Sequence, residues 1–139
     1  MAVNGWLIDK SALVRLPHSV QVTLWAQRIE AGEVRLSTIT RLEVGYSARS
    51  ESELLDAFAT PPLSAMPIEG LTPKIEELAW ETLKQLAKRG QHRAPSLPNL
   101  LIAATAQLCD LSLLHLDKDF DLISKITGQQ TERLKVKSV

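Results

Sequence analysis

The stretch that decides the fold is WLIDKSAL at residues 6–13. Its apolar run is too short for a helix and predicts a buried strand that ends at a single carboxylate, Asp9. A helix-capable segment follows at once, so Asp9 stands at the carboxyl end of a strand, where open α/β sheets place their ligand crevices. Asp is also a common helix N-cap, and taken alone the position favours capping. The same order of strand, acid and helix returns later in the chain, which favours a shared site.

The bulk composition is that of one globular domain spanning residues 1–139, with 45% hydrophobic and 23% charged residues. Net charge is zero and aromatic residues make up only 4%, so a nucleic-acid site must be a local basic patch without extensive base stacking. No apolar run approaches a membrane span, and the N-terminus lacks a secretory signal. Cys109 is the only cysteine, which excludes an internal disulfide and favours the reducing cytoplasm.

Segments typical of strands and helices alternate along the chain. Further strands are expected at 34–36, 63–68, 111–116 and 131–136. Helices are expected at 11–16, 19–31 with Ser19 as N-cap, around 41–46, 50–60, 73–89 and 96–106. This alternation predicts an α/β fold in which helices cover both faces of a mostly parallel sheet.

Glu43 has two interpretations. Thr40-x-x-Glu43 fits a capping box, in which the Glu side chain accepts a backbone N–H at the start of the helix. Alternatively, Glu43 points from the first helical turn into the same crevice as Asp9.

A basic cluster, formed by Lys88, Arg89, His92 and Arg93, follows the long helix at 73–89. Cations at this place complement the negative end of a helix. That interpretation leaves His92 and Arg93 unexplained, and a patch that contacts RNA phosphates fits equally well.

Four oxygen-bearing side chains, of Asp9, Glu43, Asn99 and Asp117, fall where a strand or loop enters a helix. The carboxyl ends of parallel strands share one edge, so the four can converge on one pocket. Clustered carboxylates repel each other, and a hard divalent cation relieves the repulsion. Oxygen ligands suit Mg²⁺ or Mn²⁺ rather than zinc, and such an ion can activate water against a phosphate.

The motifs around these residues, in this order, resemble PIN-domain ribonucleases and, more narrowly, the VapC toxins of VapBC toxin–antitoxin pairs. The motifs are LIDKSA at 7–12, STITRLEVG at 37–45, PSLPNLLIAATA at 95–106 and LHLDKDFD at 114–121. The resemblance implies a three-layer α/β/α fold with a central sheet of four or five strands. It also implies a Mg²⁺-dependent endoribonuclease that cuts tRNA or ribosomal RNA, forms a homodimer, and is neutralised by a VapB-type antitoxin in a heterotetramer or larger complex.

By position, Asp9, Glu43 and Asp117 match the catalytic acids of the family, and Asp119 matches a frequent additional acid. The resemblance thus implies a metal held by Asp9, Asp117, Asp119 and the residue at position 99. At this position the chain has Asn99, where the pattern calls for Asp. Asn keeps a carbonyl oxygen but lacks the negative charge of Asp.

Two explanations of Asn99 compete: an inactivating substitution in an active enzyme, or a natural chain that is a weak or inactive enzyme. The match around position 99 favours the first. The second leads to an alternative function, a PIN-fold module that holds RNA or a partner without cutting.

Overall fold

The computed structural model describes residues 4–138, which contain a five-stranded sheet in the order β3-β2-β1-β4-β5 with every neighbouring pair parallel. The strands are β1 (Trp6–Ile8), β2 (Val34–Ser37), β3 (Ile68–Glu69), β4 (Ser112–His115) and β5 (Thr131–Arg133). In the register, Ile8 of β1 lies opposite Leu36 of β2 and Leu114 of β4. The predicted parallel α/β sheet is therefore confirmed.

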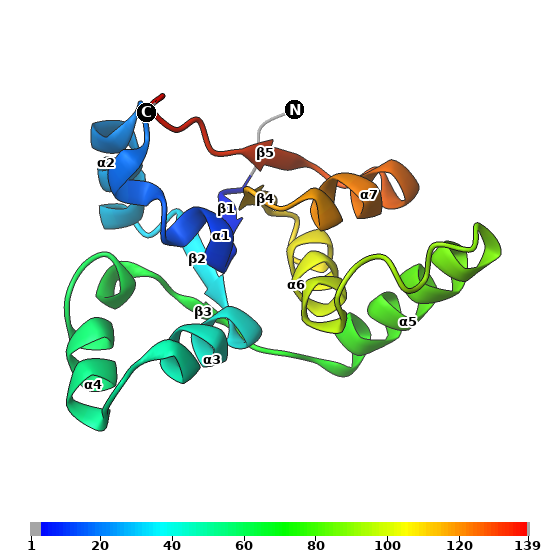
Figure 1. The fold of residues 1–139 in the computed structure, drawn as a ribbon, viewed down its shortest axis with the longest axis horizontal. Helices are drawn as coiled ribbons and strands as arrows, with labels where there is room; N and C mark the ends of the chain where they lie inside the picture. Colours follow the sequence, from blue (N-terminus) through cyan, green and yellow to red (C-terminus); the bar gives the residue numbers. More distant parts are fainter. Residues whose placement is uncertain (1–3, 139) are drawn as a thin grey trace.

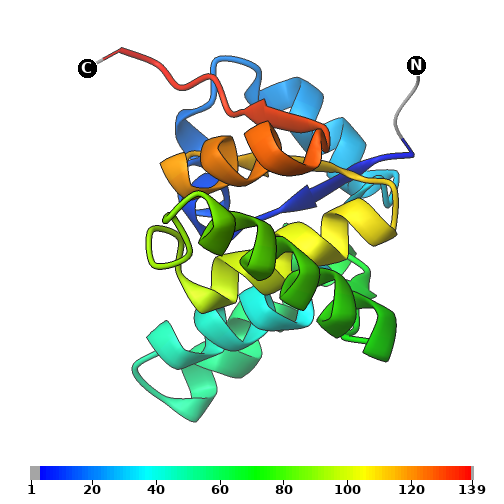
Figure 2. The same cartoon turned by 90° about the vertical axis from the view of Figure 1, so that its right-hand side faces the viewer.

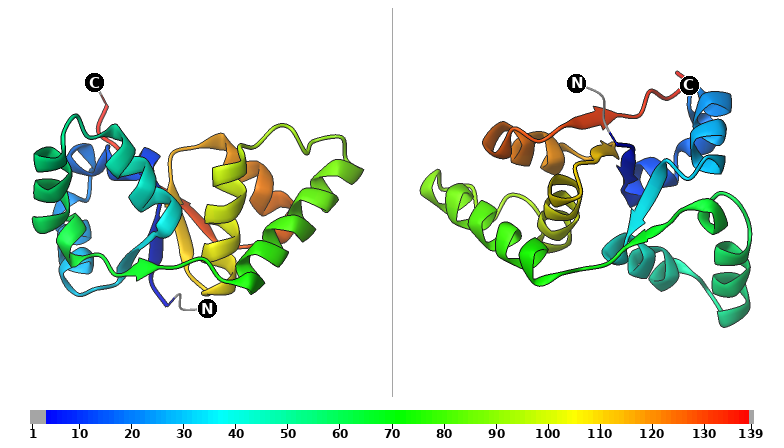
Figure 3. Two further views of the ribbon diagram at one scale, coloured as in Figure 1. Left: turned by 90° about the horizontal axis from the view of Figure 1, so that it is seen from below. Right: turned by 180° about the vertical axis from the view of Figure 1, so that it is seen from behind.

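Helices cover both faces of this sheet, which gives three layers (Figure 1). The helices are α1 (Lys10–Leu13), α2 (Val22–Glu30), α3 (Thr38–Ser47), α4 (Glu51–Ala59), α5 (Pro73–Lys88), α6 (Leu97–Leu108) and α7 (Lys118–Thr127), with 3₁₀ turns η1 (Leu16–His18) and η2 (Leu63–Ala65). Helices α5, α6 and α7 form one layer, seen face-on in Figure 2, while α1 and α2 lie on the other side of the sheet. Helices α3 and α4 pack beside the β3 edge (Figure 3). Within residues 4–138, no helix is both long and apolar enough to cross a membrane.

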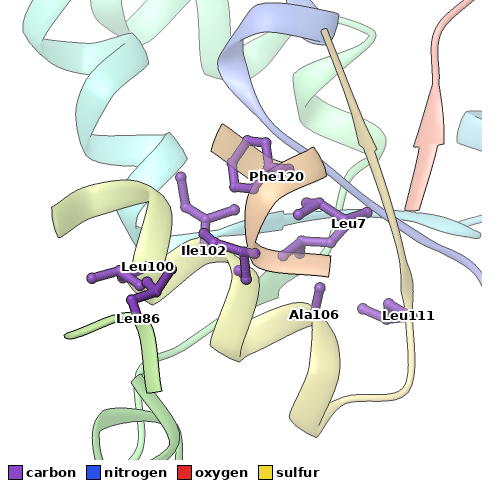
Figure 4. Close-up of a cluster of buried hydrophobic side chains, with 10 residues drawn as sticks. Leu7, Leu86, Leu100, Ile102, Ala106, Leu111 and Phe120 are labelled. Carbon is purple, nitrogen blue, oxygen red and sulfur yellow. The ribbon is translucent and has the colours of Figure 1, made fainter. Parts of the chain in front are cut away.

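The alternation of side chains along each strand divides the core in two. Leu7 and Leu113 face α6 and α7, where Phe120 is buried with them (Figure 4). Ile8 and Leu114, the next residues along, face the α1 and α2 side. Strands buried on both faces are typical of parallel sheets, and accordingly β1 is apolar throughout and the two central residues of β4 are leucines.

Several predicted boundaries are wrong, because bonds that the sequence pattern does not encode redirect the backbone. Helix α2 begins at Val22 rather than Ser19, since Ser19 is extended, bridges Val136, and accepts the N–H of Gln21 on its Oγ. The helix predicted at 11–16 ends at Leu13, and a separate 3₁₀ turn follows. Residues 63–65 form a 3₁₀ turn instead of a strand, and the N–H groups of Ser64 and Ala65 bond back to the carbonyls of Thr60 and Pro62.

The order of the strands positions the site. After β1 the chain adds β2 and β3 on one side, and then crosses through α5 and α6 to add β4 and β5 on the other. Where the connections leave a central strand in opposite directions, a crevice opens beyond the carboxyl ends of the strands. Here that central strand is β1, and its last residue is followed directly by Asp9.

Candidate active site

A cavity of about 400 Å³ lies at this carboxyl edge of the sheet. It is lined by Asp9, Lys10, Ser11, Val14, Glu43, Ser96, Asn99 and Asp117. The structure therefore brings together all four side chains that the sequence placed at a common pocket. They come from segments that are far apart in the chain: the end of β1, α3, the first turn of α6 and the end of β4.

Asp9 both caps a helix and lines the cavity. It is the N-cap of α1 and accepts the N–H of Ala12 at 3.1 Å, and it also lines the cavity with only 4% of its surface exposed. Burial raises the pKa of the Asp9 carboxyl, although a hydrogen bond from Ser11 Oγ and two backbone contacts act in the opposite direction. A cation in the cavity would favour the charged carboxylate.

Ser11 is a site residue that the sequence analysis did not single out. Its Oγ donates to Asp9 Oδ1 at 2.7 Å and accepts the N–H of Leu116 at 2.8 Å. This hydroxyl therefore joins the end of β1 to the segment that follows β4. In the sequence, the feature that could have identified Ser11 is its position two residues after Asp9, at the start of the same short helix.

Glu43 lines the cavity from the second turn of α3, and its proposed capping box is absent. The helix starts at Thr38, and its N-cap is Ser37, whose Oγ accepts the N–H of Thr40 at 3.0 Å. Because Thr40 is inside the helix, it cannot form a box with Glu43. The half-buried Glu43 side chain is left for the cavity.

Asn99 lies in the first turn of α6 and links two acids. Its Nδ2 donates to Asp117 Oδ2 at 3.1 Å and to Asp119 Oδ2 at 2.9 Å. The reversed amide would turn its carbonyl oxygen toward two carboxylates, so their charge fixes the orientation. Ser96 caps α6, since its Oγ accepts the Asn99 N–H at 3.2 Å.

Asp117 and Asp119 are held by the start of α7. Asp117 is the N-cap of this helix, and its Oδ1 accepts the N–H of Asp119 at 2.9 Å. Asp119 Oδ2 also accepts the N–H of Ser96 at 3.0 Å. Asp119 therefore contacts Asn99 from outside the ring of residues that line the cavity.

His115, the last residue of β4, lies beneath the site and was also missed from the sequence. Its ring is fully buried, and its Nδ1 accepts the N–H of Asp117 at 3.1 Å. Burial lowers the pKa of His115 more strongly than Asp121, Asp9 and Asp117 raise it, so the ring is neutral at neutral pH.

The side chains of the basic cluster do not line the cavity. All four are exposed. The C-terminal end of α5 points away from the sheet (Figures 1 and 3). The cation on the cavity wall is Lys10 instead, which donates to Ser47 Oγ from α1.

An apolar groove of about 930 Å³ adjoins the cavity between α3 and α4 and shares Lys10 and Glu43 with it. Its walls include the exposed Leu42 and Tyr46, which are 61% and 94% exposed. Exposed apolar residues gathered in one hollow are typical of a binding surface.

The donor atoms of the cavity fit a hard divalent cation. The four predicted side chains offer only oxygen to a metal, the chemistry that Mg²⁺ and Mn²⁺ prefer. Within residues 4–138, no three Asp, Glu, His or Cys side chains are grouped closely enough to hold a metal on their own. Asn99 contributes to this, because it supplies no charge and its amide bonds to Asp117 and Asp119.

The chain is similar in sequence to a family model and to known ribonucleases. The family model described as PIN domain matches residues 6–126. The chain is 58% identical to Ribonuclease VapC2 of Mycobacterium tuberculosis, with 96% of this chain and 95% of that protein covered. It is 40% identical to Ribonuclease VapC51 of the same species, with 89% and 88% covered.

Solved structures with the same fold are more distant in sequence. One is DNA-bound VapBC from Salmonella typhimurium, with a TM-score of 0.74 at 14% identity and coverage of 93% of this chain and 97% of that chain. Another is VapBC2 from Rickettsia felis bound to a promoter DNA fragment, with a TM-score of 0.72 at 16% identity and coverage of 94% and 98%. At these identities the likeness concerns the fold alone.

Proposed function

The chain belongs to the PIN-domain family, and from this premise we propose that it is a metal-dependent endoribonuclease of the VapC type, the toxin of a toxin–antitoxin pair. The observation that carries the proposal is the cavity at the carboxyl edge of the sheet, where Asp9, Glu43, Asn99 and Asp117 meet. The names of the relatives supply the reaction class, and the substrates proposed are structured RNAs such as tRNA or ribosomal RNA. Because these RNAs are cytoplasmic, the enzyme would work in the cytoplasm.

The proposed cofactor is Mg²⁺, with Mn²⁺ able to replace it. Asp9, Asp117, Asp119 and the carbonyl oxygen of Asn99 are the residues that would hold it. When bound, such an ion lowers the pKa of a water molecule and stabilises charge on a scissile phosphate.

Several side chains orient the carboxylates of the cavity or can contact the substrate and the attacking water. Ser11 orients the Asp9 carboxylate through a hydrogen bond, and the start of α7 orients Asp117. Glu43 presents carboxylate oxygens to the cavity that can take the proton lost by an attacking water. The Lys10 ammonium on the cavity wall can pair with an RNA phosphate.

We propose that Asn99 weakens this activity. A first ligand of Mg²⁺ usually contributes charge as well as a lone pair, and Asn supplies only the lone pair. The present chain should bind Mg²⁺ more weakly than its Asn99→Asp variant, and only the variant should cut RNA efficiently.

Mg²⁺ titration and RNA cleavage, measured for both proteins with circular dichroism as a check on folding, test the proposal. Equal cleavage rates would show that position 99 does not anchor the metal. Absence of cleavage by both proteins would reject the nuclease function.

The second candidate function is an RNA- or partner-binding module without catalysis. The bonds from Asn99 to two acids favour it, because they occupy carboxylate oxygens that a cation would need. RNA binding by the Asn99→Asp variant without any Mg²⁺-dependent cleavage would support this function over the first.

We also propose a homodimer and a VapB-type antitoxin partner. The groove between α3 and α4 supports a protein partner, since it is apolar, exposed and continuous with the cavity. A neighbouring gene for a small DNA-binding protein, whose product co-purifies with this chain and blocks RNA cleavage by the Asn99→Asp variant, would establish the pair. The mass of the chain alone in solution tests the dimer.

A further inference from the structure

His115 is a buried polar side chain whose presence packing alone does not explain. Its ring is 0% exposed and packs edge-on against Phe120, with 5.2 Å between ring centroids. Among the buried side-chain atoms of residues 4–138, its Nε2 is one of two that have no hydrogen-bond partner. An unsatisfied buried donor costs about 1–3 kcal/mol, so an apolar residue here would stabilise the fold more.

The other ring nitrogen contacts the site. Nδ1 accepts the backbone N–H of Asp117 at 3.1 Å. A neutral imidazole accepts at one nitrogen only if its proton is on the other, so this bond requires the proton on Nε2. Asp121 Oδ1 lies 3.7 Å from Nε2 and favours that tautomer, while Asp121 Oδ2 is bound to Arg133 at 2.9 Å.

We propose that His115 is a positioning residue for Asp117. The bond to Nδ1 fixes the Asp117 backbone at the junction of β4 and α7. With the backbone fixed and Oδ1 held by the Asp119 N–H, Oδ2 is the oxygen directed at Asn99 and the cavity. The functional value of this positioning rests on the proposed nuclease function, but the positioning itself can be measured without catalysis.

Three substitutions separate positioning from packing. His115→Leu removes both nitrogens and keeps an apolar side chain in the core. His115→Asn returns an acceptor near the place of Nδ1, so it should restore the bond in part. Ser112→Ala is the matched control, because Ser112 is also buried on β4 but lies at the opposite end of the strand.

Nuclear magnetic resonance of the protein with Asn99 tests the geometry without any reaction. We expect the His115 proton on Nε2 and a protected Asp117 amide. In His115→Leu, exchange of that amide should accelerate about tenfold or more, while global stability stays equal or rises. His115→Asn should keep part of the protection, and Ser112→Ala all of it. A proton on Nδ1, or unchanged protection in His115→Leu, would overturn the proposal.

Kinetics in the Asn99→Asp background test the consequence for function. Loss of a residue that orients a metal ligand typically lowers activity or metal affinity about 10–100-fold. We therefore expect His115→Leu to lower kcat and Mn²⁺ affinity by that amount with little change in KM for RNA, and His115→Asn to recover part of both. Unchanged kcat and Mn²⁺ affinity would reject the positioning role. If Asn99→Asp itself does not cut, the nuclease proposal fails, whereas amide exchange and Mn²⁺ binding still decide the role of His115.

Discussion

Asn99 is the uncharged side chain that links two acids at the cavity. Its amide donates to Asp117 and Asp119, and so holds together two carboxylates that would otherwise repel each other. The same amide removes one charge from the set of metal ligands. Stability without metal and activity with metal therefore make opposite demands on position 99.

Asn99→Asp should lower stability when metal is removed. The change replaces two hydrogen bonds by a third carboxylate, and we expect a loss of about 1–3 kcal/mol in EDTA at neutral pH. Mg²⁺ should restore the stability of the variant more than that of the parent, because a ligand that binds the folded state stabilises it. Urea unfolding of both proteins with EDTA and with Mg²⁺ measures this. Equal stability in EDTA would mean that the amide bonds contribute nothing.

Asp9→Asn should have the opposite effect. Because the pKa of Asp9 is raised in the folded state, its contribution to stability is full below the ordinary value of 3.8 and is lost as pH rises through the raised value. Asn removes this loss and can still cap α1. In EDTA at neutral pH we expect the melting temperature to rise by roughly 4 °C. The gain should shrink as the pH falls toward 3.8, and a gain independent of pH would contradict the assignment.

The start of α3 separates the structural role of Ser37 from the functional role of Glu43. The Ser37 hydroxyl accepts the Thr40 N–H at 3.0 Å and donates to Thr40 Oγ1 at 3.1 Å, all in a buried environment. Ser37 is therefore the residue that fixes where this helix begins. Glu43, on the next turn, is free to serve the cavity.

Ser37→Ala should cost about 1–2 kcal/mol of stability, as the loss of a helix cap does. Glu43→Gln should change stability by less than about 0.5 kcal/mol, and in the Asn99→Asp background it should lower RNA cleavage by about 100-fold. Thermal unfolding and cleavage rates of the two variants give the comparison. A stability loss in Glu43→Gln equal to that in Ser37→Ala would mean that Glu43 caps the helix after all.

Most helices were predictable because capping residues and glycines mark their ends. The short strand β3 was not, because its sequence carries no such signal. Ser96 before Pro98 indicates the start of α6, and Gly32 and Gly90, both at positive φ, follow the ends of α2 and α5. The strand predicted at 63–68 was wrong, because β3 depends on its pairing with β2 and no local pattern encodes that. Tertiary context likewise moved the first turn of α2 away from Ser19.

Across the molecule, the gathering of the four side chains was predictable because parallel strands share one carboxyl edge. The roles of Ser11 and His115 were not, since they depend on hydrogen bonds between β1 and β4 or beneath the cavity. Nor did the sequence reveal that no side chain of the basic cluster lines the cavity. The C-terminal end of α5, where Lys88 lies, points away from the sheet, and that direction is set by packing (Figure 1).

Replacing Lys88, Arg89 and Arg93 together by Ala tests whether the basic cluster binds RNA. Each lost phosphate contact lowers the slope of log affinity against log salt by about 0.7–0.9, so the triple variant should lose about 2–3 units. Because none of the three side chains lines the cavity, kcat should change little. RNA binding measured over a range of salt gives the slope, with Arg49→Ala, which removes an exposed cation paired with Glu53, as control. An unchanged slope would mean that the cluster does not contact RNA and only complements the negative end of α5.

The strand order also decides when the site comes into being during synthesis. The ribosome makes Asp9 first, yet the hydrogen bond that joins Ser11 to Leu116 spans 105 residues. Pairings this distant along the chain form late. A nascent chain therefore carries Asp9 and Glu43 through most of translation without a cavity, and a product truncated before β4 never acquires one. A nuclease built on this order cannot assemble its cavity until β4 and the start of α7 have been translated.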